Sequence, residues 1–180
     1  DLLVQLLPSD QHEGGISTSP LSYKFWWDNR GSAISQATME LLKLVPYLAQ
    51  TEQSTGKWIH IDIEPEPDGL LENHREFVDW YTDILIPYAI TAGIPEDWVR
   101  RHIHICFDVC HYGVSFDKPS SCLQELAEKN ISIRFMKKLR RVTIKVCWKL
   151  VVPLDLCCTD SVKNMVLQKP CVLLHRPMTM

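Results

Sequence analysis

Two seven-residue segments with the same alternation limit what this chain can fold into. In Trp58–Glu64, isoleucines alternate with histidine, aspartate and glutamate, and in His102–Asp108, isoleucine and phenylalanine alternate with histidine, cysteine and aspartate. Successive side chains of a strand point to opposite faces, so each segment predicts a strand with one apolar and one polar face. We expect the two segments to be neighbouring parallel strands, with Glu64 and Asp108 at the same end of the sheet.

Helical periodicity between these strands predicts an α/β fold. Apolar residues recur at helical spacing over Ile34–Leu48 and again over Phe77–Tyr88, where Pro87 is expected to kink or split the helix. Asp68 is a suitable N-cap for this second helix. A further helical pattern precedes a strand that begins at Ile131. Alternating strands and helices predict a parallel sheet.

The polar face of the two segments distinguishes between the common parallel architectures. A sheet covered by helices on both faces is apolar on both sides. A doubly wound sheet also has a Gly-rich phosphate loop after a strand, and the sequence contains no such motif. The pattern favours a TIM (β/α) barrel of which the isoleucines face the helices and the polar residues line the interior. A complete barrel takes eight strands and roughly 200 residues or more, so we expect a barrel fragment, and the family resemblance given below implies that it is incomplete at both ends.

Acidic and imidazole side chains follow both segments, where the catalytic residues of such barrels lie. Glu64 and Glu66 stand in a turn stiffened by two prolines, and the second segment continues as D-V-C-H from Asp108 to His111. Together at one barrel mouth, these groups would bind a divalent cation such as Mn²⁺, Mg²⁺ or Zn²⁺. The alternative interpretation makes Glu64 a solvated acid, Asp108 a helix cap and His111 a local hydrogen-bonding residue.

Charge and glycine content change abruptly near residue 133. Residues 1–133 contain 9 Lys/Arg and 20 Asp/Glu, a net charge of −11, whereas residues 134–180 contain 10 Lys/Arg and 2 Asp, a net charge of +8. No glycine follows Gly113. We therefore expect a partial barrel domain over 1–133 and an atypical basic tail over 134–180. The tail is expected not to complete the barrel and to be out of frame, as after a frame error or a misread splice junction. Nucleic-acid binding by the basic tail is the less favoured interpretation.

Three stretches carry a resemblance to a known family. Gly15–Lys24, Ile63–Glu72 and Cys106–His111 read GISTSPLSYK, IEPEPDGLLE and CFDVCH. Together and in this order they resemble the metabolite-traffic protein E family of the ebo gene clusters. That family is similar to the xylose-isomerase-like barrels, also described as sugar phosphate isomerase/epimerase-like. The resemblance covers residues 1–133 and implies the middle of a longer barrel.

The resemblance also implies site residues. It assigns the divalent metal to Glu64, Asp108 and His111, with Glu66 as the competing acid, and it makes Glu64 and Glu66 the catalytic carboxylates. Barrels of this superfamily also use a later histidine and a later glutamate, and residues 134–180 show no match to either.

The expected function is that of a metal-dependent sugar or sugar-phosphate isomerase or epimerase linked to metabolite traffic. A metal would bridge adjacent substrate oxygens while a carboxylate moves a proton, and Tyr23 and Lys24 would contact the substrate. The alternative is a non-enzymatic protein that binds a small metabolite. A metal-dependent endonuclease-like barrel ranks third, because the acidic body disfavours phosphate binding. The chain alone is expected to be poorly soluble and inactive as an isomerase.

Composition bounds the compartment and the partners. Seven cysteines, an odd number without a small-scaffold spacing, predict reduced thiols and a cytoplasmic location. The sequence has no window of 18 uncharged apolar residues, so we expect no membrane span, and its 180 residues contain no pattern of a secretory signal. The expected partner is a small sugar-like metabolite rather than nucleic acid or membrane.

Overall fold

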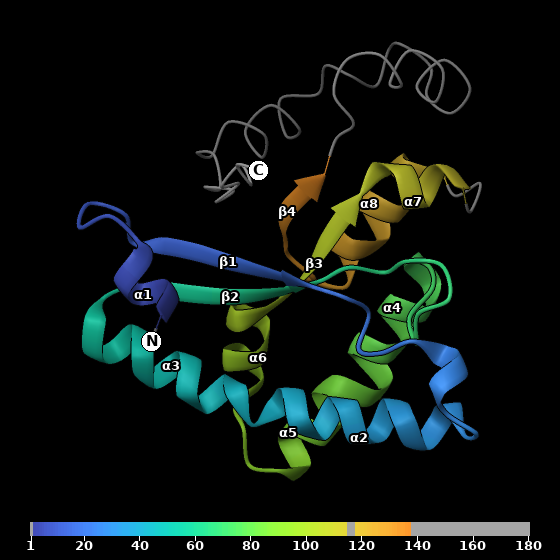
Figure 1. Ribbon diagram of the computed structural model, residues 1–180, viewed down its shortest axis with the longest axis horizontal. Coiled ribbons are helices and arrows are strands. Elements are labelled where there is room, and N and C mark those ends of the chain that lie inside the picture. Colours follow the sequence, from blue (N-terminus) through green and yellow to red (C-terminus); the bar gives the residue numbers. More distant parts are fainter. Residues whose placement is uncertain (1, 115–117, 138–180) are drawn as a thin grey trace, which may run out of the picture.

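The computed structural model describes residues 2–114 and 118–137, which form an α/β structure around a four-stranded parallel sheet (Figure 1). The strands lie side by side in chain order, β1-β2-β3-β4. Their bounds are β1 Glu13–Thr18, β2 Trp58–Ile63, β3 Ile103–Asp108 and β4 Ile133–Lys137. The last strand crosses position 133, where the sequence predicts a boundary. Most of the predicted basic tail, residues 138–180, lies outside the described residues.

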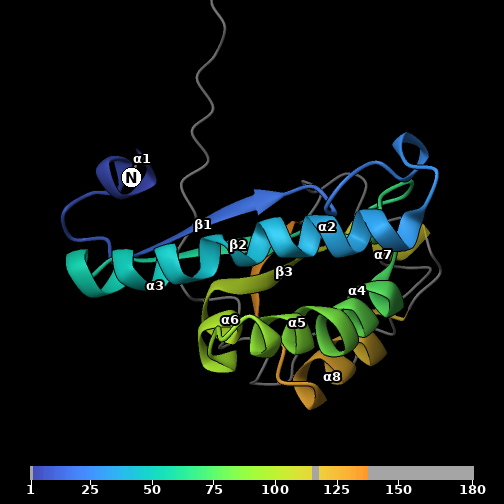
Figure 2. The same cartoon turned by 90° about the horizontal axis from the view of Figure 1, so that it is seen from below.

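Helices connect every pair of neighbouring strands. A short α1 (Leu2–Leu6) precedes the sheet, and the connections contain η1 (Lys24–Trp26), α2 (Arg30–Leu42), α3 (Leu44–Thr55), α4 (His74–Trp80), η2 (Tyr81–Leu85), α5 (Ile86–Thr91), α6 (Glu96–His102), α7 (Val109–Val114) and α8 (Pro119–Glu128). Helices α2 to α6 and α8 lie on one face of the sheet (Figure 2). Among the described residues, no helix has the length and apolarity needed to cross a membrane.

The pairing of β2 with β3 confirms the predicted arrangement of the two polar-faced segments. The strands are parallel, and Asp62 is the register partner of His104, with an isoleucine pair on either side. The polar side chains of the two strands therefore share one face, and the isoleucines share the other. Parallel strands place their carboxyl ends at one edge, so Glu64 and Asp108 lie at the same end of the sheet, as predicted.

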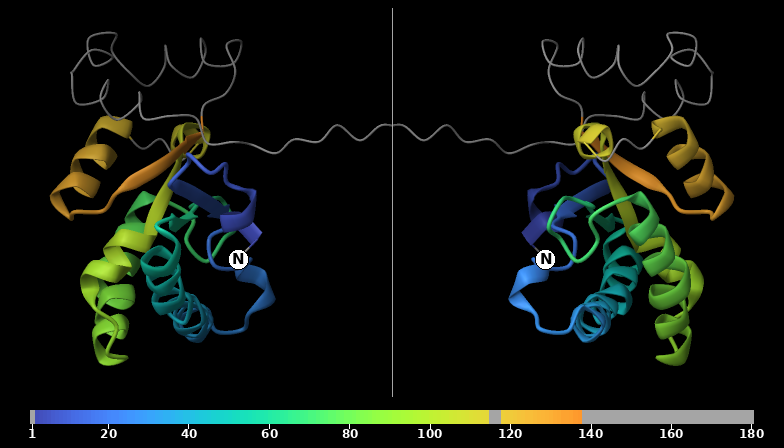
Figure 3. Two further views of the ribbon diagram at one scale, coloured as in Figure 1. Left: turned by 90° about the vertical axis from the view of Figure 1, so that its left-hand side faces the viewer. Right: turned by 90° about the vertical axis from the view of Figure 1, so that its right-hand side faces the viewer.

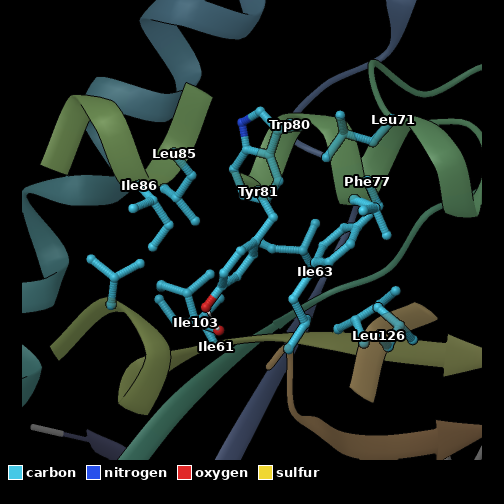
Figure 4. Packing of buried hydrophobic residues seen from close by; sticks show 14 of the residues in the cluster. Ile61, Ile63, Leu71, Phe77, Trp80, Tyr81, Leu85, Ile86, Ile103 and Leu126 are labelled. Carbon is cyan, nitrogen blue, oxygen red and sulfur yellow. Dashed lines mark hydrogen bonds between the residues drawn. The ribbon is translucent and has the colours of Figure 1, made fainter. Parts of the chain in front are cut away.

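The apolar face of the sheet packs against the helices. Ile61, Ile63 and Ile103 contact aromatic and aliphatic side chains of α4, η2, α5 and α8 (Figure 4). Phe77, Trp80 and Tyr81 are at most 2% exposed and pack with ring centroids 5.5–6.2 Å apart. Burial of this apolar area against one face supplies most of the driving force for the fold, so the isoleucines face the helices as the sequence predicts.

The sheet is strongly twisted and curved. In Figure 1, β1 and β2 run almost horizontally while β3 and β4 rise steeply, and Figure 3 shows the same turn from the side. Some Cα atoms of the outer strands β1 and β4 approach within 8 Å. In a flat sheet, three strand spacings of about 4.8 Å would separate them by roughly 14 Å. The polar side chains thus line the face that the helices leave uncovered.

Two helix predictions need correction. The pattern over Ile34–Leu48 predicts one helix, but the structure has two, which meet at Lys43. Asp68 does not cap the helix that contains Phe77. It adopts a left-handed backbone conformation with φ of 66°, and its carboxylate lies 3.0 Å from Lys24 Nζ, so it is engaged in another contact.

The N-cap of α4 is Asn73, whose side-chain oxygen accepts a hydrogen bond from the backbone N–H of Glu76 at 3.0 Å. Replacing Asn73 by alanine is expected to lower the free energy of unfolding by about 0.5–2 kcal/mol, because a backbone donor loses its partner. Gln53→Ala, an exposed change within α3, serves as the control and is expected to stay within about 0.5 kcal/mol. Urea denaturation followed by circular dichroism measures both; equal losses would contradict the assigned cap.

Pro87 divides the long helix of the second connection, as predicted. A π-helical turn, η2, separates α4 from α5, and Pro87 lies in the first turn of α5. Proline lacks the N–H that an α-helix needs, and the wider π turn accommodates the break without ending the helical direction. Tyr81 lies in this turn, and its hydroxyl donates a hydrogen bond to the backbone carbonyl of Ile103 at 3.1 Å, which links the turn to β3.

Candidate metal centre at the sheet edge

The carboxyl ends of β1, β2 and β3 surround Glu64. The backbone N–H of Glu64 donates to Thr18 O at 3.0 Å, continuing the pairing of β2 with β1 by one residue. Its side chain is buried, and its carboxylate accepts hydrogen bonds from the hydroxyl of Ser17 at 3.3 Å and from the thiol of Cys106 at 3.7 Å. Donors from both neighbouring strands therefore orient this carboxylate.

Glu66 and His111 complete a group of possible cation ligands with Glu64. One ligand atom from each residue lies within 4.8 Å of the others. Two ligands at about 2 Å on opposite sides of a cation are about 4 Å apart, so a small side-chain adjustment brings all three into coordination range. Nδ1 of His111 lies 3.0 Å from Pro65 O and 3.7 Å from Glu64 Oε1. A hydrogen bond to a backbone carbonyl is the usual way in which a metal-binding imidazole is oriented.

Asp108 lies beside this group and is not a member of it in the structure. Its Oδ1 accepts a hydrogen bond from the backbone N–H of Cys110 at 2.8 Å, at the point where β3 passes directly into α7. Such a contact is typical of an aspartate at the start of a helix. Of the predicted metal residues, the structure brings together Glu64 and His111, and it adds Glu66 where the sequence placed Asp108.

Tyr23 and Lys24, the predicted substrate-binding residues, lie in the loop after β1. Lys24 Nζ contacts Asp68 at 3.0 Å and Glu72 at 2.5 Å, and these hydrogen bonds raise its pKa. The ring of Tyr23 packs edge-on against Phe25 and is partly exposed. In this arrangement Lys24 joins the loops that follow β1 and β2, and its charge is already balanced by two carboxylates.

A second group of possible ligands lies deeper on the polar face and was not predicted as a site. His60, Asp62 and His104 are 2%, 0% and 1% exposed, and one ligand atom from each lies within 4.8 Å of the others. His60 Nδ1 is 3.0 Å from Asp62 Oδ1, and His104 Nδ1 is 3.7 Å from the same oxygen. The sequence signal was the in-register His-x-Asp and His-x-Cys alternation, which indicates a shared face but no distance.

The electrostatics of this second group keep the aspartate charged and the histidine neutral. Burial raises the pKa of Asp62, but the imidazoles of His104 and His60 outweigh burial and lower the pKa below its ordinary value. Burial is the main cause that lowers the pKa of His104. A charged Asp62 and a neutral His104 are the protonation states in which a carboxylate and an imidazole bind metal ions.

Comparisons with known proteins place no constraint on either group. No protein-family model, no curated protein and no solved structure matches the chain. The functional assignment therefore rests on the geometry of the chain itself.

Proposed function

We propose that this chain carries the metal-binding part of a sugar or sugar-phosphate isomerase or epimerase built on a xylose-isomerase-like barrel. The proposal is supported by the convergence of Glu64, Glu66 and His111 at the carboxyl end of parallel strands. Catalytic groups of (β/α) barrels lie at this end.

Three features of the sheet support a barrel over a doubly wound sheet. The strands follow one another in chain order without reversal, whereas a doubly wound sheet reverses its order at a switch point. The main helices lie on one face, and the other face is polar. The curvature that brings β1 towards β4 is in the sense that a closing sheet requires.

The donor set fits a divalent cation. Two carboxylates and one imidazole suit Mn²⁺, Zn²⁺ or Mg²⁺, and a cation held there would supply Lewis acidity towards adjacent oxygens of a sugar. Glu64, buried and oriented by Ser17 and Cys106, is suited to hold the cation. Glu66 is less buried, at the outer end of a proline-stiffened turn, and is positioned to take a proton from the substrate and return it.

Mn²⁺ binding by the full 180-residue chain tests the site. Free Mn²⁺ measured by electron paramagnetic resonance is expected to fall on addition of the chain, and the double variant Glu64→Gln/His111→Gln is expected to bind at least tenfold more weakly because two ligands are lost. Asp79→Asn, an exposed carboxylate of α4, is the matched control and is expected to bind as the unchanged chain does. Equal affinity of the double variant and the control would overturn the site.

The reaction class is tested by proton exchange rather than by turnover, because the chain alone is expected to lack full isomerase activity. The metal-loaded chain is mixed with a panel of aldoses, ketoses and their phosphates in D₂O. Loss of the proton signal on the carbon next to the carbonyl group, abolished by Glu66→Gln, would support proton transfer of the isomerase type. Saturable sugar binding without this exchange would favour the non-enzymatic metabolite-binding alternative and overturn the isomerase. The absence of both binding and exchange would overturn both functions.

A further inference from the structure

We infer that His60, Asp62 and His104 form a second cation site, separate from the group at the sheet edge and suited to Zn²⁺. The three side chains come from the middle of β2 and the start of β3, where the strands pair in register. Asp62 and Glu64 are two residues apart on one face of the chain, so the two groups are about 7 Å apart along the strand direction.

Two buried atoms of this group have no hydrogen-bond partner among the described residues, namely Asp62 Oδ2 and His104 Nδ1. Both side chains are at least 99% buried. A buried carboxylate oxygen and a buried imidazole nitrogen without partners are costly, and such atoms in a folded protein require an occupant that the protein atoms do not supply.

The ring orientation of His104 shows that a lone pair, and not an N–H, faces the occupant. Its Nε2 lies 3.0 Å from the backbone carbonyl of Arg100, which can only accept, so Nε2 carries the proton. In the neutral ring, Nδ1 then presents a lone pair, and it points towards the carboxylate of Asp62 at 3.7 Å. Two electron-rich atoms facing each other at this distance are attracted by a cation between them.

His60 differs from His104, because its Nδ1 is at hydrogen-bond distance, 3.0 Å, from Asp62 Oδ1. A cation at this position would replace the shared proton of that hydrogen bond. The carboxylate of Glu13 lies 3.6 Å from Nε2 on the other side of the ring, where outer carboxylates orient zinc-binding histidines. The separation of 3.0 Å is also close to that of two ligands on one tetrahedral ion.

Gly15 lets the group lie close against β1. Its register partner across β1 and β2 is His60, and an added Cβ would lie 2.4 Å from His60 Cε1 and 2.7 Å from Asp62 Oδ2. Any larger residue at this position would therefore collide with the ring of His60 and with the unpartnered oxygen of Asp62. Two imidazoles and one carboxylate match the His₂-carboxylate set of zinc sites, and nitrogen ligands favour Zn²⁺ over Mg²⁺.

Zinc stoichiometry of the full chain tests the inference independently of the proposed function. The metal-free chain is titrated with Zn²⁺ in competition with a chromogenic indicator, in the Glu64→Gln/His111→Gln background that removes the edge group. We expect one equivalent bound in this background and none after adding His104→Gln. His102→Gln is the matched control, because His102 is equally buried, neighbours the group and is bonded instead to Ile59 O.

Separate outcomes decide the two proposals. Loss of one equivalent with His104→Gln but not with His102→Gln supports the second site, even if Glu64 and His111 prove irrelevant to metal binding. No zinc uptake in the background, or uptake unchanged by His104→Gln, overturns it. Should His104→Gln fail to fold, imidazole nitrogen NMR of the unchanged chain replaces it. Zn²⁺ must then shift Nδ1 of His60 and His104, and unshifted signals overturn the site.

Discussion

Replacing Phe77 by alanine is expected to lower the free energy of unfolding by about 3–5 kcal/mol, the usual cost of removing a buried aromatic side chain. The Phe77 side chain is completely buried beside Trp80 and Tyr81 and lies against Ile63 of the sheet (Figure 4). Its removal loses the free energy gained by burying the ring away from water. It also leaves a cavity bounded by large rings that cannot readily move in to fill it. Urea denaturation followed by circular dichroism measures the loss.

Phe25→Ala is the matched control for this change. Phe25 is 67% exposed in η1 and contacts mainly the ring of Tyr23. Its truncation is expected to change the free energy of unfolding by less than about 0.5 kcal/mol. If the two substitutions lower the free energy of unfolding equally, the core does not lie between the sheet and α4.

Gly15→Ala is expected to destabilise the chain by about 1–3 kcal/mol, because a methyl group is forced into a packed site. The added carbon would lie closer than 3.0 Å to atoms of His60 and Asp62, which both belong to β2, the strand paired with β1 on one side and β3 on the other. A flexible surface side chain would move aside, but these two buried groups would have to shift together with their strands. Thermal or urea denaturation reports the effect.

Gly31→Ala provides the control within the same chain. Gly31 lies in α2, and an added Cβ would come no closer than 3.4 Å to Asn29 Oδ1. Alanine in an exposed helix is expected to stabilise by about 0.5–1 kcal/mol, since glycine loses more backbone freedom on folding. Stabilisation by Gly15→Ala, or an equal effect of the two changes, would contradict the packing described for β1.

The sheet could be predicted from the sequence because its signal is local. A period of two in Trp58–Glu64 and in His102–Asp108 identifies both strands and both faces, and the carboxylate at each end marks their direction. The helix ends were harder to predict. Asp68 and Asn73 are both good caps by residue type, and only the distant Lys24, which binds Asp68, decides between them.

The membership of the candidate sites depends on distances that periodicity does not supply. Glu66, and not Asp108, belongs to the group with Glu64 and His111. The carboxylate of Asp108 instead accepts a hydrogen bond from the backbone N–H of Cys110, where β3 passes directly into α7. The group around Asp62 depends on the register of β2 with β3, where a shift of one residue would move His104 to the apolar face.

The sheet has a consequence for the order of folding during synthesis. Every strand pair in it is parallel, so the sheet contains no hairpin that could form early. Strand β1 has no pairing partner until β2, which begins at Trp58, has been synthesised. Helices α2 and α3 leave the ribosome after β1 and before β2, so they can pack against each other before the sheet that they cover has formed. Contacts of such long sequence separation form slowly, so β1, with Ile16 exposed on it, passes through a period in which its edge can bind chaperones or other nascent chains.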